Sequence, residues 1–426
     1  MGNMRSVILS SMPTSTDQEQ RTEESLLDEM SEHYLTSLDF NGLPVRAIGG
    51  PSEHIMSLVK RLVTSGRVDV VFGDTHPNPH IKAFDPGPID TQMEKIERLG
   101  LTEACLYPSP TYLEEVVDDA QYDGLPFTAK LALGEPQLSH YSFDLRVLEQ
   151  YRRDPRYYYW CDDISGRVSV SSKHYESDEM RDADKVLLES FGFAYSERME
   201  RAVAVFLRYL YRLSPEHQQV WSTHLLAGEH HLHPDYLRSS LGDWALGVSA
   251  FEAFMEEIRQ INKLTGIIWQ VPLFRHEYRD SERPKHFSLL IRPTLAEFND
   301  FVLVLDKMIS DNLNHRFLKR RVITDDARNK GSIAMLEEWL RSTVRFHDSE
   351  FVDQMFLVLK NVRSMRQRPA HAIEEDEFDQ SYFQKQRWLI AGAYSAVRTL
   401  RMIFQLHPDT KTYTVPAFLS GHIWLY

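Results

Sequence analysis

Three arginines and a histidine lie close together in residues 361–371, which read NVRSMRQRPAH. Arg363 and Arg366 are three residues apart, so a helix would place both on one side. Pro369 would end that helix and leave His371 at a helix junction. A guanidinium can donate two hydrogen bonds to a phosphate, and a histidine can transfer protons near neutral pH. These residues could therefore cleave RNA without a metal, with the histidine taking the proton of a ribose 2′-hydroxyl.

Other basic residues could bind RNA phosphates. Residues 152–160 (RRDPRYYYW) mix arginines with aromatic rings, a combination that can stack bases and hold single-stranded RNA. The same residues also fit a helix end followed by an aromatic strand, and a basic cluster can simply be solvated surface. The candidate phosphate-binding residues are Arg363, Arg368, Lys319, Arg320, Arg321, Arg153 and Arg156. For residues 361–371, the alternative is that the arginines pair with the acidic run 374–377 and His371 caps a helix.

Two histidine clusters could hold a metal. Residues 229–235 (EHHLHPD) contain His230, His231 and His233, and residues 74–80 (DTHPNPH) follow an expected strand. A metal-dependent hydrolase on the first cluster is one alternative, but PD in that segment favours a polar turn before a helix. Walker A, GxGxxG, HExxH, GxSxG and CxxC patterns are all absent from the sequence. We therefore expect no cofactor and no metal.

Composition narrows the class of protein. The 426 residues include 48 Lys and Arg against 62 Asp and Glu, which gives a formal charge of −14. This acidic balance argues against a general nucleic-acid coat, although a local basic site remains compatible with it. The two cysteines cannot form a disulfide framework, and no apolar run is long enough to cross a bilayer. We expect a cytoplasmic protein without a membrane partner.

The pattern along the chain predicts an α+β protein. In the first half, residues 68–72 and 104–107 are typical of strands, residues 165–171 of half a hairpin, and residues 26–35 of an amphipathic helix. We also expect a helix over 199–210 and strands at 267–271 and 287–291. The expected organisation is a flexible leader (1–38), a mixed α/β region (41–175), a mainly helical middle (178–292), a helical bundle (293–408) and a tail (409–426) that could add a strand.

Four expected helices make up the bundle. Each carries a single apolar stripe, which it can bury only against the other helices. In the third, the expected stripe is Phe351, Met355, Leu359 and Val362. In the fourth, it runs from Ile390 to Phe404. The helices are expected from 298 to 309, 333 to 344, 350 to 366 and 379 to 405.

The arrangement of Arg366, four intervening residues and His371 inside such a bundle resembles the R-x4–6-H motif of HEPN domains. The resemblance covers about residues 294–408. HEPN domains are all-helical and often dimeric, and many are metal-independent endoribonucleases of toxin, CRISPR-associated or anti-phage proteins. The resemblance implies that two motifs form one composite site in a homodimer, with Arg366 stabilising the transition state and His371 as acid or base.

This sequence departs from the HEPN pattern at two positions. Gln367 stands where Asn or Asp is frequent, and Ile373 stands where toxins controlled by nucleotidyltransferase antitoxins have a tyrosine. By analogy with the family, residues 41–175 would be a sensing or regulatory region that responds to a trigger or partner protein. The alternative is a non-enzymatic partner-binding protein whose HEPN-like bundle only dimerises.

Overall fold

The computed structural model describes residues 21–49, 52–74, 76–175, 177, 180–243, 247–279, 282–322, 330–346, 349–367 and 375–424. The chain divides into two compact units, Met1–Ser139 and His140–Tyr426. Both units combine helices with antiparallel strands, which confirms the α+β fold class.

The N-terminal unit contains a three-stranded antiparallel sheet. Its strands are β1 (Leu43–Pro44), β3 (Cys105–Pro108) and β2 (Val68–Val71), in that order, so the strands expected from residues 68–72 and 104–107 are confirmed. The apolar stripe of α2, from Ile55 to Val63, is buried in the core of this unit. The helices are α1 (Glu23–Thr36), α2 (Ser52–Thr64), α3 (Ile89–Leu99), α4 (Pro110–Val116) and α5 (Pro126–Ala132).

A six-stranded antiparallel sheet begins the second unit. The strand order is β4–β8–β7–β6–β5, and β9 pairs with the end of β7. The β5–β6 hairpin confirms the strand expected at 165–171. The boundary that the sequence suggested between the regions 41–175 and 178–292 falls inside this sheet, between β6 and β7. The strands are β4 (His140–Phe143), β5 (Tyr157–Cys161), β6 (Ser165–Val170), β7 (Leu187–Tyr195), β8 (Arg201–Phe206) and β9 (His231–Leu232).

The helix expected over 199–210 is wrong. Residues Arg201–Phe206 form β8, and only Leu207–Leu210 are helical, as α7. Every residue from Ala202 to Phe206 is buried. A strand buried on both faces has a continuous apolar run, which hydrophobic periodicity does not separate from a buried helix. The other short helices around the sheet are α6 (Glu149–Arg153), α8 (Pro215–Thr223) and α9 (Pro234–Ser240).

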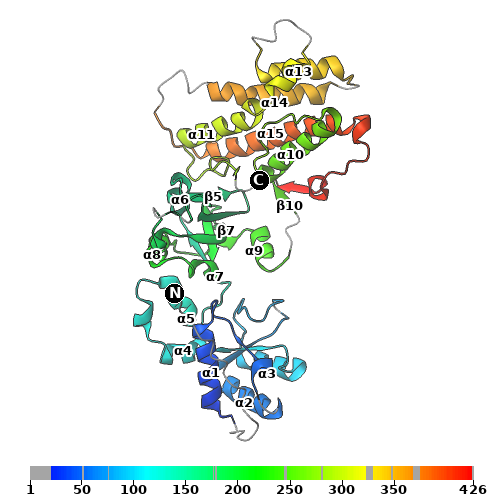
Figure 1. Ribbon diagram of the computed structural model, residues 1–426. Coiled ribbons are helices and arrows are strands. Elements are labelled where there is room, and N and C mark those ends of the chain that lie inside the picture. The colour runs from blue at the N-terminus through cyan, green and yellow to red at the C-terminus, as the bar shows by residue number, and fades with distance from the viewer. Residues whose placement is uncertain are drawn as a thin grey trace, which may run out of the picture. The chain divides into compact units, whose positions relative to one another are not determined.

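Long helices form the rest of the second unit around one hydrophobic core. Figure 1 shows α10, α11, α14 and α15 running side by side, with α13 next to α14. The expected stripe of α15, from Ile390 to Phe404, is buried. β10 (Gly247–Ser249) and β11 (His422–Trp424) pair in parallel, which confirms a strand in the tail. The helices are α10 (Ala250–Trp269), α11 (Leu295–Asp306), α12 (His315–Lys319), α13 (Ser332–Thr343), α14 (Glu350–Gln367) and α15 (Ser381–Gln405).

The helical core contains α10 as well as the four helices expected from sequence. Arg401 of α15 donates to the buried Glu257 of α10 at 2.7 Å and 3.1 Å, so an ion pair joins the two helices. The sequence boundary between 292 and 293 therefore lies between two helices, α10 and α11, that share one core.

Three local sequence expectations in this core are wrong. Residues expected as a strand at 267–271 instead include the last turn of α10, which ends where Gln270 takes a left-handed conformation (φ 57°). Residues 287–291 contain no strand. Phe351 is 70% exposed, because the buried face of α14 is formed by Val352, Met355, Phe356, Leu359 and Val362.

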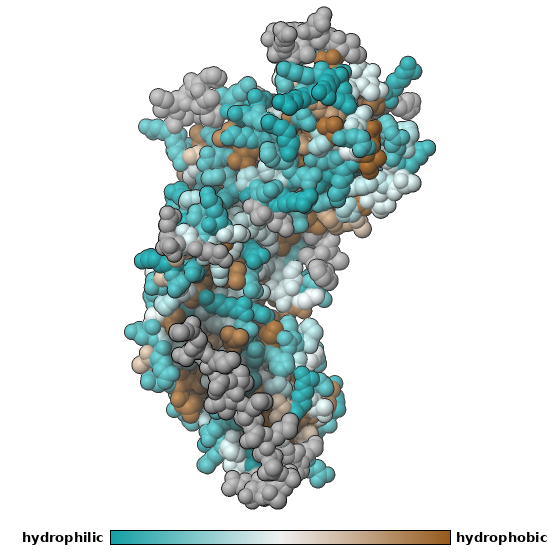
Figure 2. Space-filling view, viewed as in Figure 1, coloured by the Kyte–Doolittle hydropathy of each residue, from teal (hydrophilic) through white to brown (hydrophobic). Residues whose placement is uncertain are grey.

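Within the described part of the chain, no helix is both long and apolar enough to cross a membrane. Figure 2 shows hydrophilic side chains over much of the visible face of the helical bundle, with hydrophobic ones scattered among them.

Candidate active site

Arg363 and Arg366 lie near the C-terminal end of α14, on the same side of the helix as expected. They face the end of α11, where the helix continues into a π-helical turn, Lys307–Asp311. Such turns are rare and occur frequently at functional sites. The turn places Asp306 and Asp311 next to the two arginines.

One carboxylate oxygen holds both arginines. Oδ2 of Asp306 accepts hydrogen bonds from Nη1 of Arg366 at 2.7 Å and from Nη1 of Arg363 at 2.9 Å. Asp311 accepts from the same two Nη1 atoms, at 3.2 Å and 3.1 Å. Ser310 completes the cluster, because its hydroxyl donates to Asp306 and accepts from Arg363.

The two acidic residues differ sharply in burial. The side chain of Asp306 is 1% exposed and that of Asp311 is 43% exposed. A buried carboxylate needs paired charge and hydrogen bonds, and the arginines supply both to Asp306. The hydrogen bond to Asp306 raises the pKa of Arg366. Arg366 is therefore a permanently charged group held in one position.

Both guanidinium groups have N–H donors that the contacts with the two aspartates do not use. Arg363 and Arg366 use only Nη1 in these contacts, so Nε and Nη2 donate to no other described residue. Their side chains are 39% and 29% exposed. The Nε and Nη2 atoms of one guanidinium form the pair of parallel donors that binds two phosphate oxygens.

Residues 368–374, which include Arg368 and His371, lie outside the described residues. The sequence left open that the arginines pair with the acidic run 374–377. Arg363 and Arg366 instead form ion pairs with Asp306 and Asp311. Two acidic residues of that run have other contacts. Asp376 accepts from the backbone of Ala296, and Glu377 accepts from the Tyr382 hydroxyl.

The cluster at the end of α12 divides into two kinds of residue. Lys319 and Arg320 are exposed. Arg321 instead stacks over the ring of Phe317, with its Cζ 3.6 Å from the ring centre, and donates to the Phe317 carbonyl. Burial and the charge of Arg320 lower the pKa of Arg321. Arg321 thus has a packing role, whereas Lys319 and Arg320 are accessible to an anionic ligand.

Arg153 and Arg156 lie at the junction of α6 and β5, the helix end and aromatic strand that the sequence left as an alternative. Arg153 is 66% exposed and 3.7 Å from Glu149. Arg156 donates from Nε and Nη2 to Asp154, so this pair of donors is already used within the protein. Arg153 is therefore more accessible to an anionic ligand than Arg156.

The histidine clusters do not converge. His233 is buried and accepts from the backbone of Asp235 at the start of α9, while His230 contacts the carbonyl of Gly228. His76 contacts the backbone of Asn78, and His80 contacts Cys105 at 3.7 Å. Among the described residues, no group of three or more His, Cys, Asp or Glu side chains is placed to hold a metal.

Sequence reasoning missed Asp306 and Asp311 as partners of the arginines. A signal was present, because Asp306 directly follows the apolar run 301–305 at the C-terminal end of α11, and a carboxylate packed beside apolar residues needs a cation.

No known protein family, curated protein or solved structure matches this chain. The geometry of the arginine–aspartate cluster therefore stands as the main guide to function.

Proposed function

We propose that this protein is a metal-independent endoribonuclease of the HEPN type, with Arg366 and His371 as its catalytic residues. The observation that supports this most directly is the anchoring of Arg366 by the buried Asp306, after which Nε and Nη2 of Arg366 have no partner among the described residues. A guanidinium that is held in place and can still donate from Nε and Nη2 can stabilise a pentacoordinate phosphate without any movement of the side chain. The R-x4-H spacing places His371 five residues along the chain from that guanidinium.

In the proposed reaction, His371 accepts the proton of a ribose 2′-hydroxyl, and the 2′ oxygen attacks the adjacent phosphorus. The bond from phosphorus to the 5′ oxygen breaks, and the leaving oxygen takes a proton from the histidine of a second protomer. Arg366 donates to the non-bridging oxygens, where negative charge increases. The products are a 2′,3′-cyclic phosphate and a 5′-hydroxyl end.

RNA affinity must come from outside the arginine–aspartate cluster. Two guanidinium groups and two carboxylates give the cluster no net charge. In our proposal the exposed Lys319 and Arg320 contact RNA phosphates, as does Arg153. Such contacts are electrostatic, so binding should weaken as salt increases.

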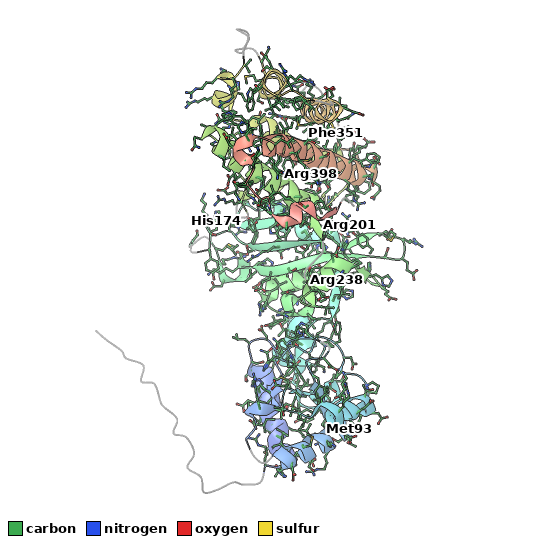
Figure 3. All side chains as sticks on the ribbon, turned by 90° about the vertical axis from the view of Figure 1, so that its right-hand side faces the viewer. Met93, His174, Arg201, Arg238, Phe351 and Arg398 are labelled. Carbon is green, nitrogen blue, oxygen red and sulfur yellow. The ribbon has the colours of Figure 1, made fainter. Side chains whose placement is uncertain are left out.

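The proposed enzyme is a cytoplasmic homodimer in bacterial anti-phage defence or a toxin system, regulated by a trigger or partner protein through the N-terminal region. An interface between two bundles would bury large apolar side chains that are now exposed. Phe351 on α14, labelled in Figure 3, and Trp388 on α15 are each 70% exposed. Aromatic residues are enriched in such interfaces.

A non-enzymatic role remains the alternative, and one observation favours it. The ion pairs of Arg363 and Arg366 tie α14 to the end of α11, so a structural function alone would account for them. In that case the bundle would serve dimerisation and partner binding.

The test is a gel assay of total RNA and tRNA with EDTA, comparing the wild type with His371→Ala. We expect fragments with 2′,3′-cyclic phosphate ends from the wild type and none from the variant. The matched control is His315→Ala, which removes an exposed histidine of α12 in the same bundle. Equal cutting by His371→Ala would exclude His371 from catalysis. Intact RNA with the wild type, even after addition of lysate from phage-infected cells, would favour the non-enzymatic alternative.

A further inference from the structure

A large cleft lies between the sheet and the helical bundle of the second unit. Its volume is about 1400 Å³, which exceeds the size of most small-molecule pockets. The turn between β7 and β8 and the first half of α15 form two of its walls. Loop residues 226–230 and 291–294 form much of the remainder.

Five arginines line this cleft, and they are not equally neutralised. Arg146 is paired with Asp144 through two hydrogen bonds, and Arg292 forms an ion pair with Glu149. By contrast, Arg201 and Arg387 form no ion pair within 4.0 Å with any described residue. Nε of Arg387 is buried and has no hydrogen-bond partner among the described residues. Among the residues that the structure describes, the cleft therefore contains two guanidinium groups without a carboxylate partner.

Arg201 and Arg387 also repel each other. Burial and, to a smaller extent, the positive charge of Arg201 lower the pKa of Arg387. Asp163 attracts both arginines; it is 3% exposed, and its Oδ1 has no hydrogen-bond partner among the described residues. One carboxylate cannot balance two guanidinium groups, and burying an uncompensated charge is costly. An anion in the cleft would supply the missing negative charge.

Aromatic rings lie beside Arg201. The guanidinium of Arg201 lies 5.8 Å from the ring centre of Tyr195 on β7 and 5.8 Å from that of Phe383 on α15. Figure 3 shows Arg201 where the sheet faces the helical bundle. Tyr195 and Phe383 both line the cleft, and so does Phe378. Rings beside arginines provide stacking surfaces for a base together with donors for a phosphate.

We propose that this cleft binds a nucleotide, with its phosphates on Arg201 and Arg387 and its base against the aromatic lining. The acidic residues Glu197, Glu200 and Glu229 also line the cleft, but they are exposed and so remain hydrated. This proposal does not rest on the nuclease proposal, because the described residues assigned to RNA cleavage and binding, Arg366, Lys319, Arg320 and Arg153, do not line the cleft.

The experiment is calorimetric titration of the full chain with ATP, GTP, CTP and UTP in turn, and with inorganic pyrophosphate and a short single-stranded RNA. At least one nucleoside triphosphate should bind more tightly than pyrophosphate, because only the nucleotide has a base to stack. Arg201→Gln and Arg387→Gln should each weaken that binding about tenfold or more. The control is Arg398→Gln, which removes an arginine farther along α15 that binds Tyr394 and lies outside the cleft.

Three results would overturn the proposal. The first is no binding of any of the four nucleotides. The second is equal affinity for pyrophosphate and nucleotides, which would indicate a site for phosphate alone. The third is binding of RNA but of no free nucleotide, which would make the cleft an RNA surface.

Thermal unfolding separates lost binding from lost folding. Without ligand, Arg387→Gln should unfold at the same temperature as the wild type or higher, because the substitution removes a half-buried charge that repels Arg201. Saturating nucleotide should raise the unfolding temperature of the wild type but not of this variant. A marked fall in the unfolding temperature of Arg387→Gln would assign Arg387 a structural role instead.

Discussion

Oδ2 of Asp306 lies 2.7 Å from Nη1 of Arg366, and this contact joins the end of α11 to the end of α14. The same oxygen also accepts from Arg363. Since Asp306 is buried and the arginines are partly exposed, the carboxylate fixes the position of charged groups that reach the surface. Any chemistry of Arg366 therefore depends on a residue that a ligand cannot reach.

Asp306→Asn should destabilise the protein, because the amide keeps the shape but loses the charge that binds both arginines. Loss of charged hydrogen bonds to a buried group costs about 2 kcal/mol or more. The measurement is the free energy of unfolding in urea. Asp311→Asn is the matched control, and since Asp311 is 43% exposed its effect should stay below about 1 kcal/mol. Equal effects of the two substitutions would contradict the anchoring role of Asp306.

Arg366→Lys should separate catalysis from stability. A lysine can keep one bond to Asp306, but it cannot also present two parallel donors to a phosphate. If the proposed nuclease is correct, the rate of RNA cleavage should fall by about 10²–10³-fold while the free energy of unfolding changes little. Arg341→Lys, on the exposed face of α13, serves as control and should cut at the wild-type rate. An unchanged rate of RNA cleavage in Arg366→Lys would rule out a catalytic role for the two parallel donors of the guanidinium.

The buried pair of Glu257 and Arg401 tests how α10 is joined to the bundle. Glu257→Gln leaves the 7% exposed Arg401 without its counter-charge, which should cost about 3–5 kcal/mol of stability. Replacing both residues by methionine removes both charges and should recover most of that loss. Urea unfolding of the two variants gives the comparison. A double variant that is less stable than Glu257→Gln would show that the pair stabilises the bundle beyond charge balance.

Gly192 in β7 has no room for a side chain. A Cβ at this position would overlap the ring of Tyr236, which is buried against Phe206. Gly192→Ala should therefore destabilise the protein by about 3 kcal/mol. Gly266→Ala in α10 is the opposite control, because nothing lies within 4 Å of its Cβ position and alanine favours helix by about 1 kcal/mol. Thermal unfolding of both variants should show shifts of opposite sign.

Sequence patterns predicted elements well where a single apolar stripe met a polar face. The stripe of α15 is of this kind, and it is buried as expected. The sequence patterns gave the wrong element at β8, because burial on both faces removes any hydrophobic periodicity. They were also wrong at the end of α10, where the β-branched Ile267 and Ile268 suggested a strand. Tertiary packing decides such segments, and local propensity does not.

The candidate site could be predicted only in part. Two arginines at helical spacing were visible from sequence, and they do lie together on α14. Their partners are more than 50 positions away in the chain, so no local pattern connects them. The same holds for Arg201 and Arg387, which come from a strand and a helix and meet only in the folded unit.

Asp163 should make stability depend on pH. Burial raises the pKa of this carboxyl to about 6 in the folded protein, despite the attraction of Arg201, Arg387 and Arg283. Because the folded pKa exceeds the unfolded value of about 3.9, the folded state binds the proton more tightly. The stabilisation is complete below about pH 4 and is lost as pH rises through about 6.

Asp163→Asn removes this titration while keeping a neutral side chain of the same shape. Its free energy of unfolding should match the wild type near pH 4 and exceed it by about 3 kcal/mol at pH 7. Urea unfolding at intervals between pH 4 and 8 measures the difference. Asp243→Asn, at an exposed position, is the control substitution. If Asp163→Asn is instead less stable than the wild type at pH 7, attraction to the two cleft arginines outweighs the cost of burying the carboxylate.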